Sequence, residues 1–212
     1  MDNFKTEKFF DLSTFAYRDI FNDTNYVWEA LPRIKEYIEM QFKSGQLKPN
    51  YKDKDNVYIG EGTIIQEGVT IVGPAIIGKY ALLGHGSYIR ENCMIGNNVQ
   101  LGHAVEVKGS ILLDDSKVAH LNYVGDSIIG GKVNISGGAM LANYRLDKKS
   151  IMVIAGENKI ETGLEKFGSI VGDRSNIGVN TVLNPGTILG KNSVVYPLVC
   201  VKGVHKDNEV IK

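Results

Sequence analysis

Aliphatic residues return at every sixth position along much of this chain. They are Ile59, Ile65, Ile71, Ile77, Leu83, Ile89, Ile95, Leu101, Val107 and Leu113, and later Val171, Ile177, Leu183, Leu189, Val195 and Val201. The residue two places earlier is small or β-branched, as at Val57, Ala75 and Val99. An α-helix repeats at about 3.6 residues and a strand at about two. A period of six therefore indicates a short strand followed by a tight turn.

Three such units make an 18-residue coil with three short sides. Successive coils stack as parallel strands about 4.8 Å apart, which buries one continuous apolar column. The pattern thus predicts an all-β fold, a triangular parallel β-solenoid. A β-sandwich would show looser spacing and period-two alternation, so we disfavour it.

Three segments lie outside the repeat. Residues 1–50 contain a helical pattern, EALPRIKEYIEMQFKSG, with Gly45 as its stop, and we expect this segment to cover the end of the solenoid. Two short apolar runs around GEN predict a hairpin or loop inserted at 145–168. The polar tail after Val204 is expected to be loose. The predicted organisation is a helical segment, 1–50, and a solenoid domain, 51–212, with one insertion.

The rhythm slips by one residue around KVAHLNYVGD, residues 117–126. The inward series of Leu83 and Leu101 continues at Val118, and we place the shift at His120. His85, His103 and His120 each stand two places after those residues, so they share one corner on consecutive rungs. A local bulge would aim one side chain away from a uniform wall.

Arg90 and Lys108 are 18 residues apart, both at a corner where glycine is usual. They should stack roughly 5 Å apart. Two cations that close repel each other, so we expect a bound anion between them, and alanine variants of either should fold at least as well as the parent. The alternative is a pair of solvated cations that cost little in water. Glu106 and Tyr123 point outward on the face that leads to this corner.

The hexapeptide pattern resembles that of the hexapeptide acyltransferase superfamily, which implies a left-handed β-helix. KVAHLNYVGD, KVNISGG at 132–138 and NY at 143–144 closely resemble the glucosamine-1-phosphate N-acetyltransferase domain of a bifunctional family that makes UDP-N-acetylglucosamine. The stretch GLEKFGSIVGDRSNIGVNTVLNPGTILG is similar to the C-terminal domain of archaeal sugar-1-phosphate nucleotidyltransferases.

This resemblance implies acetyl transfer from acetyl-CoA, as co-substrate, to the amine of an amino-sugar 1-phosphate, with glucosamine-1-phosphate the closest match. It implies His120 as the catalytic base, Glu106 as its associated carboxylate, and a phosphate site at Arg90 and Lys108. The other implied substrate-binding residues are Tyr123, Asn134, Asn143, Tyr144 and Lys149. The implied cofactor-binding positions are Asn143, Val179 and Pro197, the last two in place of small residues of the family.

Composition narrows the class of partner. Lys and Arg total 24 and Asp and Glu total 24, so the net charge is zero and no basic field favours nucleic acid. No run of about 18 apolar residues could span a membrane, and the start lacks a signal-peptide pattern. Two cysteines without a CxxC motif make no disulfide framework. We expect a cytoplasmic homotrimer with small-molecule substrates and no metal. Because 50 residues cannot form a nucleotidyltransferase domain, that activity is not expected here.

Two alternatives to the acetyltransferase stay open. One is a metal enzyme similar to γ-class carbonic anhydrases, suggested by the three histidines. Imidazoles about 5 Å apart on one rigid column converge poorly on a single ion with bonds of about 2.1 Å. The other is a degenerate scaffold or a partner of a separate nucleotidyltransferase, which would lack acetyl-CoA binding.

Overall fold

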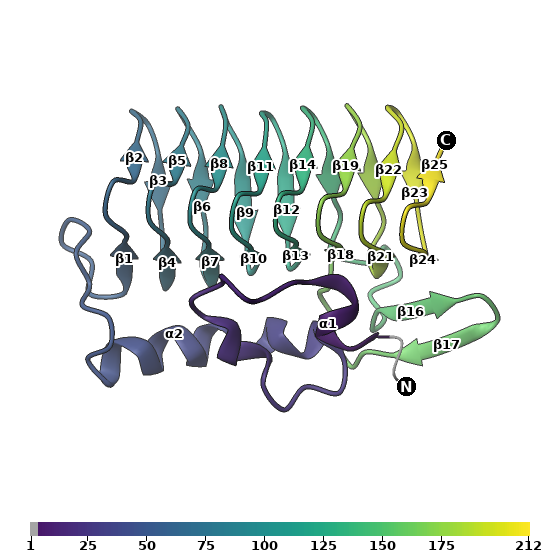
Figure 1. The fold of residues 1–212 in the computed structure, drawn as a ribbon, viewed down its shortest axis with the longest axis horizontal. Helices are drawn as coiled ribbons and strands as arrows, with labels where there is room; N and C mark the ends of the chain where they lie inside the picture. The colour runs from purple at the N-terminus through teal and green to yellow at the C-terminus, as the bar shows by residue number, and fades with distance from the viewer. Residues whose placement is uncertain (1–3) are drawn as a thin grey trace.

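The computed structural model describes residues 4–212, and most of them form a parallel β-solenoid with three faces (Figure 1). The first face contains, in order, β1 (Val57–Ile59), β4 (Ala75–Ile77), β7 (Cys93–Ile95), β10 (Ile111–Leu112), β13 (Ile128–Ile129), β18 (Ser169–Val171), β21 (Thr187–Leu189) and β24 (Val204–His205). The second face contains β2 (Ile64–Ile65), β5 (Leu82–Leu83), β8 (Gln100–Leu101), β11 (Lys117–Val118), β14 (Asn134–Ile135), β19 (Asn176–Ile177), β22 (Val194–Val195) and β25 (Val210–Ile211). The third face contains β3 (Thr70–Ile71), β6 (Tyr88–Ile89), β9 (Glu106–Lys108), β12 (Tyr123–Gly125), β15 (Met140–Leu141), β20 (Val182–Leu183) and β23 (Cys200–Val201). The predicted fold class, a left-handed parallel β-helix, is confirmed.

The aliphatic residues of the repeat fill the inside of the solenoid. Leu83, Ile89, Ile95, Leu101 and Val107 are all fully buried and belong to one core cluster. Each packs on its equivalent in the neighbouring rung, because parallel pairing superimposes residues one coil apart. This stacking is the reason that the chain keeps its six-residue period.

The register shift lies earlier than the sequence analysis placed it. Ile89 of β6 pairs with Val107 of β9, a spacing of 18, whereas Ile95 of β7 pairs with Leu112 of β10, a spacing of 17. The coil becomes one residue shorter in the connection between β9 and β10, so the placement of the shift at His120 was wrong. Val118 does pair with Leu101, as expected. A second short connection follows β12, because Leu112 pairs with Ile129.

The first short connection also changes which leucine of β10 and the turn after it points into the solenoid. Leu113, predicted to point inward, lies instead in the outer apolar cluster, while Leu112 takes the inward place. Ser110 is fully buried at this corner, and its hydroxyl donates to the Lys108 carbonyl at 2.7 Å. That hydrogen bond satisfies a buried hydroxyl group within the tightened turn.

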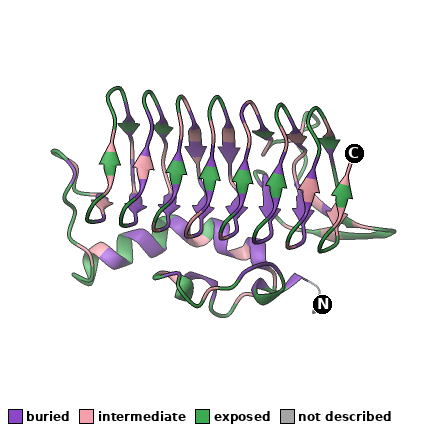
Figure 2. Cartoon of the chain, turned by 45° about the horizontal axis from the view of Figure 1, so that its top comes forward, coloured by how far each residue is buried: buried purple, intermediate pink, exposed green. Residues whose placement is uncertain are grey.

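The N-terminal segment lies along the first face of the solenoid (Figure 1). It contains α1 (Thr6–Phe9), the 3₁₀ helices η2 (Arg18–Phe21) and η3 (Val27–Arg33), and α2 (Ile34–Lys43). Helix α2 ends just before Gly45, whose φ of +76° suits glycine, as the sequence predicted. The expectation that this segment covers the end of the solenoid was wrong. Figure 2 shows the buried side of α2 turned toward the strands.

The first face needs this cover because its outward residues are apolar. They are Ile76, Met94, Ile111, Ile128, Ile170 and Ile188, and all are fully buried. They form one cluster with aromatic residues of the N-terminal segment, including Trp28, which is 1% exposed. Burying an aliphatic side chain contributes about 1.5–3 kcal/mol. On the second and third faces, outward residues of the described chain such as Gln100, Lys117 and Met140 are exposed.

The insertion forms a hairpin, as predicted. Strands β16 (Met152–Ala155) and β17 (Asn158–Glu161) pair antiparallel and project beside the last rungs (Figure 1). Val153 and Phe167 anchor it in the outer apolar cluster. The tail is not loose, because β24 and β25 pair with β21 and β22 and continue the solenoid. No helix within residues 4–212 has the length and apolarity to cross a membrane.

Candidate active site

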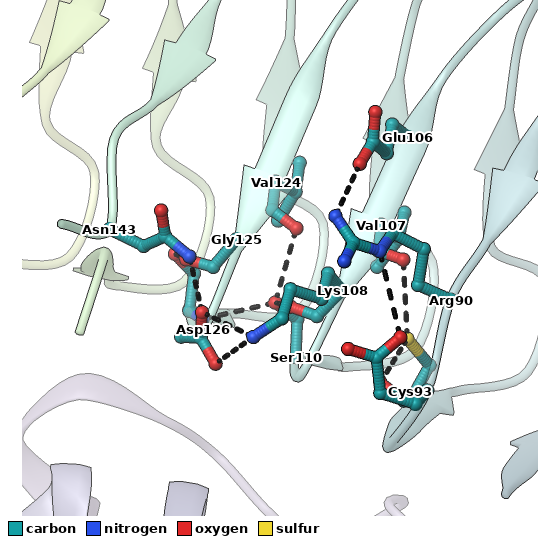
Figure 3. A network of polar contacts seen from close by, with 12 residues as sticks. Arg90, Cys93, Glu106, Val107, Lys108, Ser110, Val124, Gly125, Asp126 and Asn143 are labelled. Atoms are coloured by element: carbon teal, nitrogen blue, oxygen red, sulfur yellow. Dashed lines mark hydrogen bonds and ion pairs between the residues drawn. The ribbon is translucent and has the colours of Figure 1, made fainter. Parts of the chain in front are cut away.

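Two cations stand on adjacent rungs at the edge between the third and first faces. Arg90 follows β6 and Lys108 ends β9, and the pairing of Ile89 with Val107 places them side by side, as the repeat predicted. We call the set of Arg90, Lys108, Asp126 and Asn143 the cationic edge (Figure 3).

Neither cation is bare. The Arg90 guanidinium donates from Nη1 to Glu106 Oε1 at 3.0 Å, and its Nε lies 3.6 Å from Glu91 Oε2. The Lys108 ammonium lies 2.9 and 3.0 Å from the two Asp126 oxygens. The two side chains point in different directions (Figure 3), so their charges separate although their backbones stack. Carboxylates of the chain itself therefore relieve their repulsion, and the anion site at this pair stays a prediction.

Tyr123 and Asn143 complete this cluster. Tyr123 pairs with Glu106 across the strands, and its ring covers Gly125, where a Cβ would lie 2.5 Å from the phenol oxygen. The Asn143 amide donates to Asp126. Burial, helped by the nearby Asp126 and Glu106 charges, raises the pKa of Tyr123. The phenol is therefore a neutral hydrogen-bond donor at physiological pH.

The histidines line the opposite edge of the third face, where it meets the second. We call His85, His103 and His120 the histidine edge. The His85 and His103 rings stack with centroids 5.6 Å apart, and His103 Nδ1 lies 2.9 Å from the His85 carbonyl oxygen. Within residues 4–212, no group of three or more His, Cys, Asp or Glu side chains is arranged to hold a metal ion.

The His120 side chain is exposed and packs over Gly137. A Cβ at Gly137 would lie 2.6 Å from His120 Nε2, so glycine is needed for this close approach. Within residues 4–212, no side chain forms a hydrogen bond with the His120 ring. The Glu106 carboxylate, which the family resemblance pairs with this histidine, is bound by Arg90.

The positions implied for the acyl donor continue along the histidine edge. Asn180 donates its N–H to the Gly137 carbonyl, and Leu198 donates to that of Val179, so Val179 and Pro197 follow Gly137 on successive rungs. Both are exposed, and Val179 is 47% exposed.

Some implied substrate residues lie outside the cationic edge. Asn134 is exposed on β14, in the second face. Tyr144 forms an antiparallel bridge with Lys166 at the base of the insertion. Lys149 is exposed on the following loop, where its N–H reaches Asp147 at 3.4 Å. The structure thus unites Arg90, Glu106, Lys108, Tyr123 and Asn143, and separates Asn134 from them.

Sequence reasoning missed Asp126. Its carboxylate contacts both Lys108 and Asn143 and links three rungs. The available signal was its place one rung after Lys108, within the segment that carries the resemblance. A carboxylate stacked beside a corner lysine is a ready ion-pair partner.

Comparisons with known proteins place the chain in a family. The GMPPB C-terminal domain family matches residues 71–165, and the hexapeptide repeat of succinyl-transferase matches residues 169–196. An uncharacterized acetyltransferase of Escherichia coli, YaiX, is 30% identical over 193 residues, covering 82% of each chain. The chain therefore belongs to the hexapeptide-repeat acetyltransferases.

Within this family the chain is homologous to the C-terminal regions of larger proteins. A bifunctional sugar-1-phosphate nucleotidylyltransferase/acetyltransferase of Sulfurisphaera tokodaii is 37% identical, over 72% of this chain and 38% of the relative. The bifunctional protein GlmU of Methanococcus vannielii is 33% identical, over 90% of this chain and 47% of the relative. The chain thus spans less than half the length of these two relatives. A solved point mutant of the N-acyltransferase AntD from Bacillus cereus has a TM-score of 0.46 at 14% identity, covering 77% of this chain and 85% of that one.

Proposed function

We propose that this protein transfers an acetyl group from acetyl-CoA to the amine of an amino-sugar 1-phosphate, most closely glucosamine-1-phosphate, in sugar-nucleotide synthesis. The observation that carries the proposal is one face with the Arg90–Lys108 pair at one edge and His120 at the other. The Sulfurisphaera relative, whose name joins sugar-1-phosphate chemistry to acetyl transfer, supports the same substrate class.

The cationic edge has donors left for a phosphate. A guanidinium carries five N–H groups and an ammonium three. The contacts of Arg90 with Glu106 and Glu91, and of Lys108 with Asp126, use only part of them. Five residues of strand span roughly 16 Å, so side chains leaning over the face from both edges can reach the two ends of one sugar phosphate.

The chemistry needs a proton acceptor beside the amine. The neutral amine attacks the thioester carbonyl, a C–N bond forms, and the C–S bond breaks as the coenzyme A thiolate leaves. His120 takes the proton from the attacking nitrogen and returns it to the thiolate. Because its ring carries no hydrogen bond within residues 4–212, both ring nitrogens are available to substrate. The neutral phenol of Tyr123 donates a hydrogen bond to the sugar.

In this proposal Glu106 acts on the phosphate side. Its hydrogen bond to Arg90 fixes the guanidinium over the third face, and a guanidinium held in this way loses less conformational freedom when phosphate binds. The arm of acetyl-CoA follows the histidine edge past Gly137 toward Val179 and Pro197. A second copy of the chain closes the site, because one convex face cannot enclose a ligand.

Thiol release from acetyl-CoA tests the proposal. We expect the fastest release with glucosamine-1-phosphate, compared with galactosamine-1-phosphate and UDP-linked amino sugars, and a product that carries an N-acetyl group by mass spectrometry. Release that is independent of any amine acceptor, or a clear preference for an acceptor without phosphate, would overturn it.

A further inference from the structure

The carboxylate of Asp126 lies between two residues to which the proposed reaction assigns substrate binding. Both of its oxygens contact the Lys108 ammonium, at 2.9 and 3.0 Å, and it also accepts a hydrogen bond from the Asn143 amide (Figure 3). Lys108 and Asp126 side chains are only 12% and 15% exposed. A charge pair with this little solvent is far less screened than a surface pair. The carboxylate therefore fixes the lysine and the amide relative to each other.

The backbone around Asp126 is shaped to place this group. The Asp126 N–H donates to the Lys108 carbonyl at 2.7 Å, and its carbonyl accepts the Gly168 N–H at 2.8 Å. Its φ of +43° lies in the left-handed region, which aspartate adopts more readily than most residues, and the neighbouring rung has Gly109 at this place with a φ of +56°. A Cβ on Gly109 would lie 2.5 Å from Asp126 Oδ1. The missing Cβ of Gly109 thus leaves room for the Asp126 carboxylate beside Lys108.

The charges of this region also show that a carboxylate holds Lys108 in place. Among the five charged side chains of this region, Arg90 and Lys108 face Glu91, Glu106 and Asp126, so carboxylates outnumber cations. With two of its N–H groups directed at Asp126, the Lys108 ammonium has one direction left for a ligand. Asp126 therefore determines where that remaining N–H points.

We propose that Asp126 is a positioning residue, which aims the Lys108 ammonium and the Asn143 amide at the substrate without contacting it. This rests on the proposed function for the identity of the substrate. The geometry itself, one carboxylate holding the Lys108 ammonium and the Asn143 amide on different rungs, is independent of that identity.

The test compares Asp126→Asn with a matched control, Asp115→Asn. Asp115 also has a positive φ, +63°, and contacts an amide, Asn98 at 3.1 Å, but lies on the edge between the first and second faces. Asparagine tolerates this backbone conformation, and its amide oxygen can still accept a hydrogen bond from Lys108 at position 126, so both variants are expected to fold. We expect Asp126→Asn to lower kcat for glucosamine-1-phosphate by roughly 10- to 100-fold, as misplaced contacts do, with a smaller change in KM. Asp115→Asn should leave both constants unchanged.

A second measurement does not need activity. The rate of Lys108 labelling by acetic anhydride, read by mass spectrometry against Lys79 of the same chain, reports whether the ammonium is held. We expect faster labelling in Asp126→Asn than in the parent, and protection of Lys108 by inorganic phosphate in the parent but not in the variant. Equal labelling and equal protection in both proteins would overturn the proposal, as would faster labelling with unchanged kcat. If the parent itself acetylates no sugar phosphate, the proposed function fails on its own, and the labelling still decides whether Asp126 positions Lys108.

Discussion

Replacing Arg90 by alanine should damage phosphate recognition and little else. The Arg90 side chain is 33% exposed, and its partners Glu106 and Glu91 are 37% and 38% exposed. These carboxylates regain water when the guanidinium is removed, so the variant should lose less than about 1 kcal/mol of stability. A lost charged hydrogen bond to phosphate is worth about 1.5–3 kcal/mol. At about 1.4 kcal/mol per tenfold change, kcat/KM for glucosamine-1-phosphate should fall roughly 10- to 150-fold.

The matching substitution of Lys108 has a different expected outcome. Its removal leaves Asp126, only 15% exposed, without its cation, and because this carboxylate is partly rather than fully buried the cost should stay below the roughly 3–5 kcal/mol of a buried unpaired charge but above that of a surface pair. The expectation from stacking alone, that both alanine variants fold as well as the parent, is therefore revised. Arg90→Ala is the cleaner probe of phosphate binding.

The assay for Arg90→Ala measures kcat/KM for glucosamine-1-phosphate and for glucosamine without phosphate. Lys79→Ala is the control, because Lys79 pairs with Glu61 at 3.5 Å across one rung on another edge. We expect the loss only for the phosphorylated sugar, an unchanged control and a thermal midpoint close to that of the parent. Equal loss on both sugars would refute the reasoning, since the guanidinium would then act on something other than phosphate.

Four further predictions concern other parts of the molecule. His120→Ala should keep the fold, because the ring is exposed, and lower kcat about 10²- to 10⁴-fold; normal turnover would show that the base is misassigned. Burial raises the pKa of Tyr17 to about 12, from an ordinary value of about 10, so the folded chain keeps this proton longer than the unfolded chain. Its contribution to stability is complete below about pH 10 and is lost as the pH rises toward 12, and denaturation of Tyr17→Phe should show a shallower alkaline decline; an identical decline would contradict this. Burial also raises the pKa of Cys93 to about 12, so a thiol reagent at pH 8 should modify Cys93 only after unfolding, in contrast to exposed Cys200, and rapid native labelling of Cys93 would contradict the packing. Sedimentation should show a homotrimer, and a fully active monomer would exclude a site closed by a second copy.

The fold followed from the sequence because a single physical requirement repeats. Every rung must bury its inward aliphatic residues on those of the next rung. Residues such as Leu83 and Leu101 therefore recur at a fixed spacing that the sequence shows directly. The sequence also contained the signal that the first face is covered, although the sequence analysis did not recognise it. Outward residues at the 18-residue spacing are apolar on the first face, as Ile76 and Met94 show, and mixed on the other two.

The site was predictable in its columns but not in its side-chain directions. Stacking placed Arg90 beside Lys108, whereas the partners of each depend on where long side chains turn, and spacing does not determine that. The position of the register shift illustrates the same limit. Val118 follows Leu101 whichever connection is one residue shorter, so the pattern alone could not assign the loss to the turn at 109–110.

The short turns and the hairpin share one edge of the solenoid, and this has a consequence for how such a protein can diversify. Connections between the first and second faces, such as 60–63 and 113–116, and between the second and third, such as 84–87 and 119–122, keep one length. Those from the third face to the first vary from 109–110 to 142–168. A loop exchanged there can alter what lies beside the cationic edge without changing the pitch of the coil. The strands and the four-residue connections must stay constant, whereas the connections from the third face to the first can vary and change specificity. Loop grafting at 184–186 should be tolerated for the same reason.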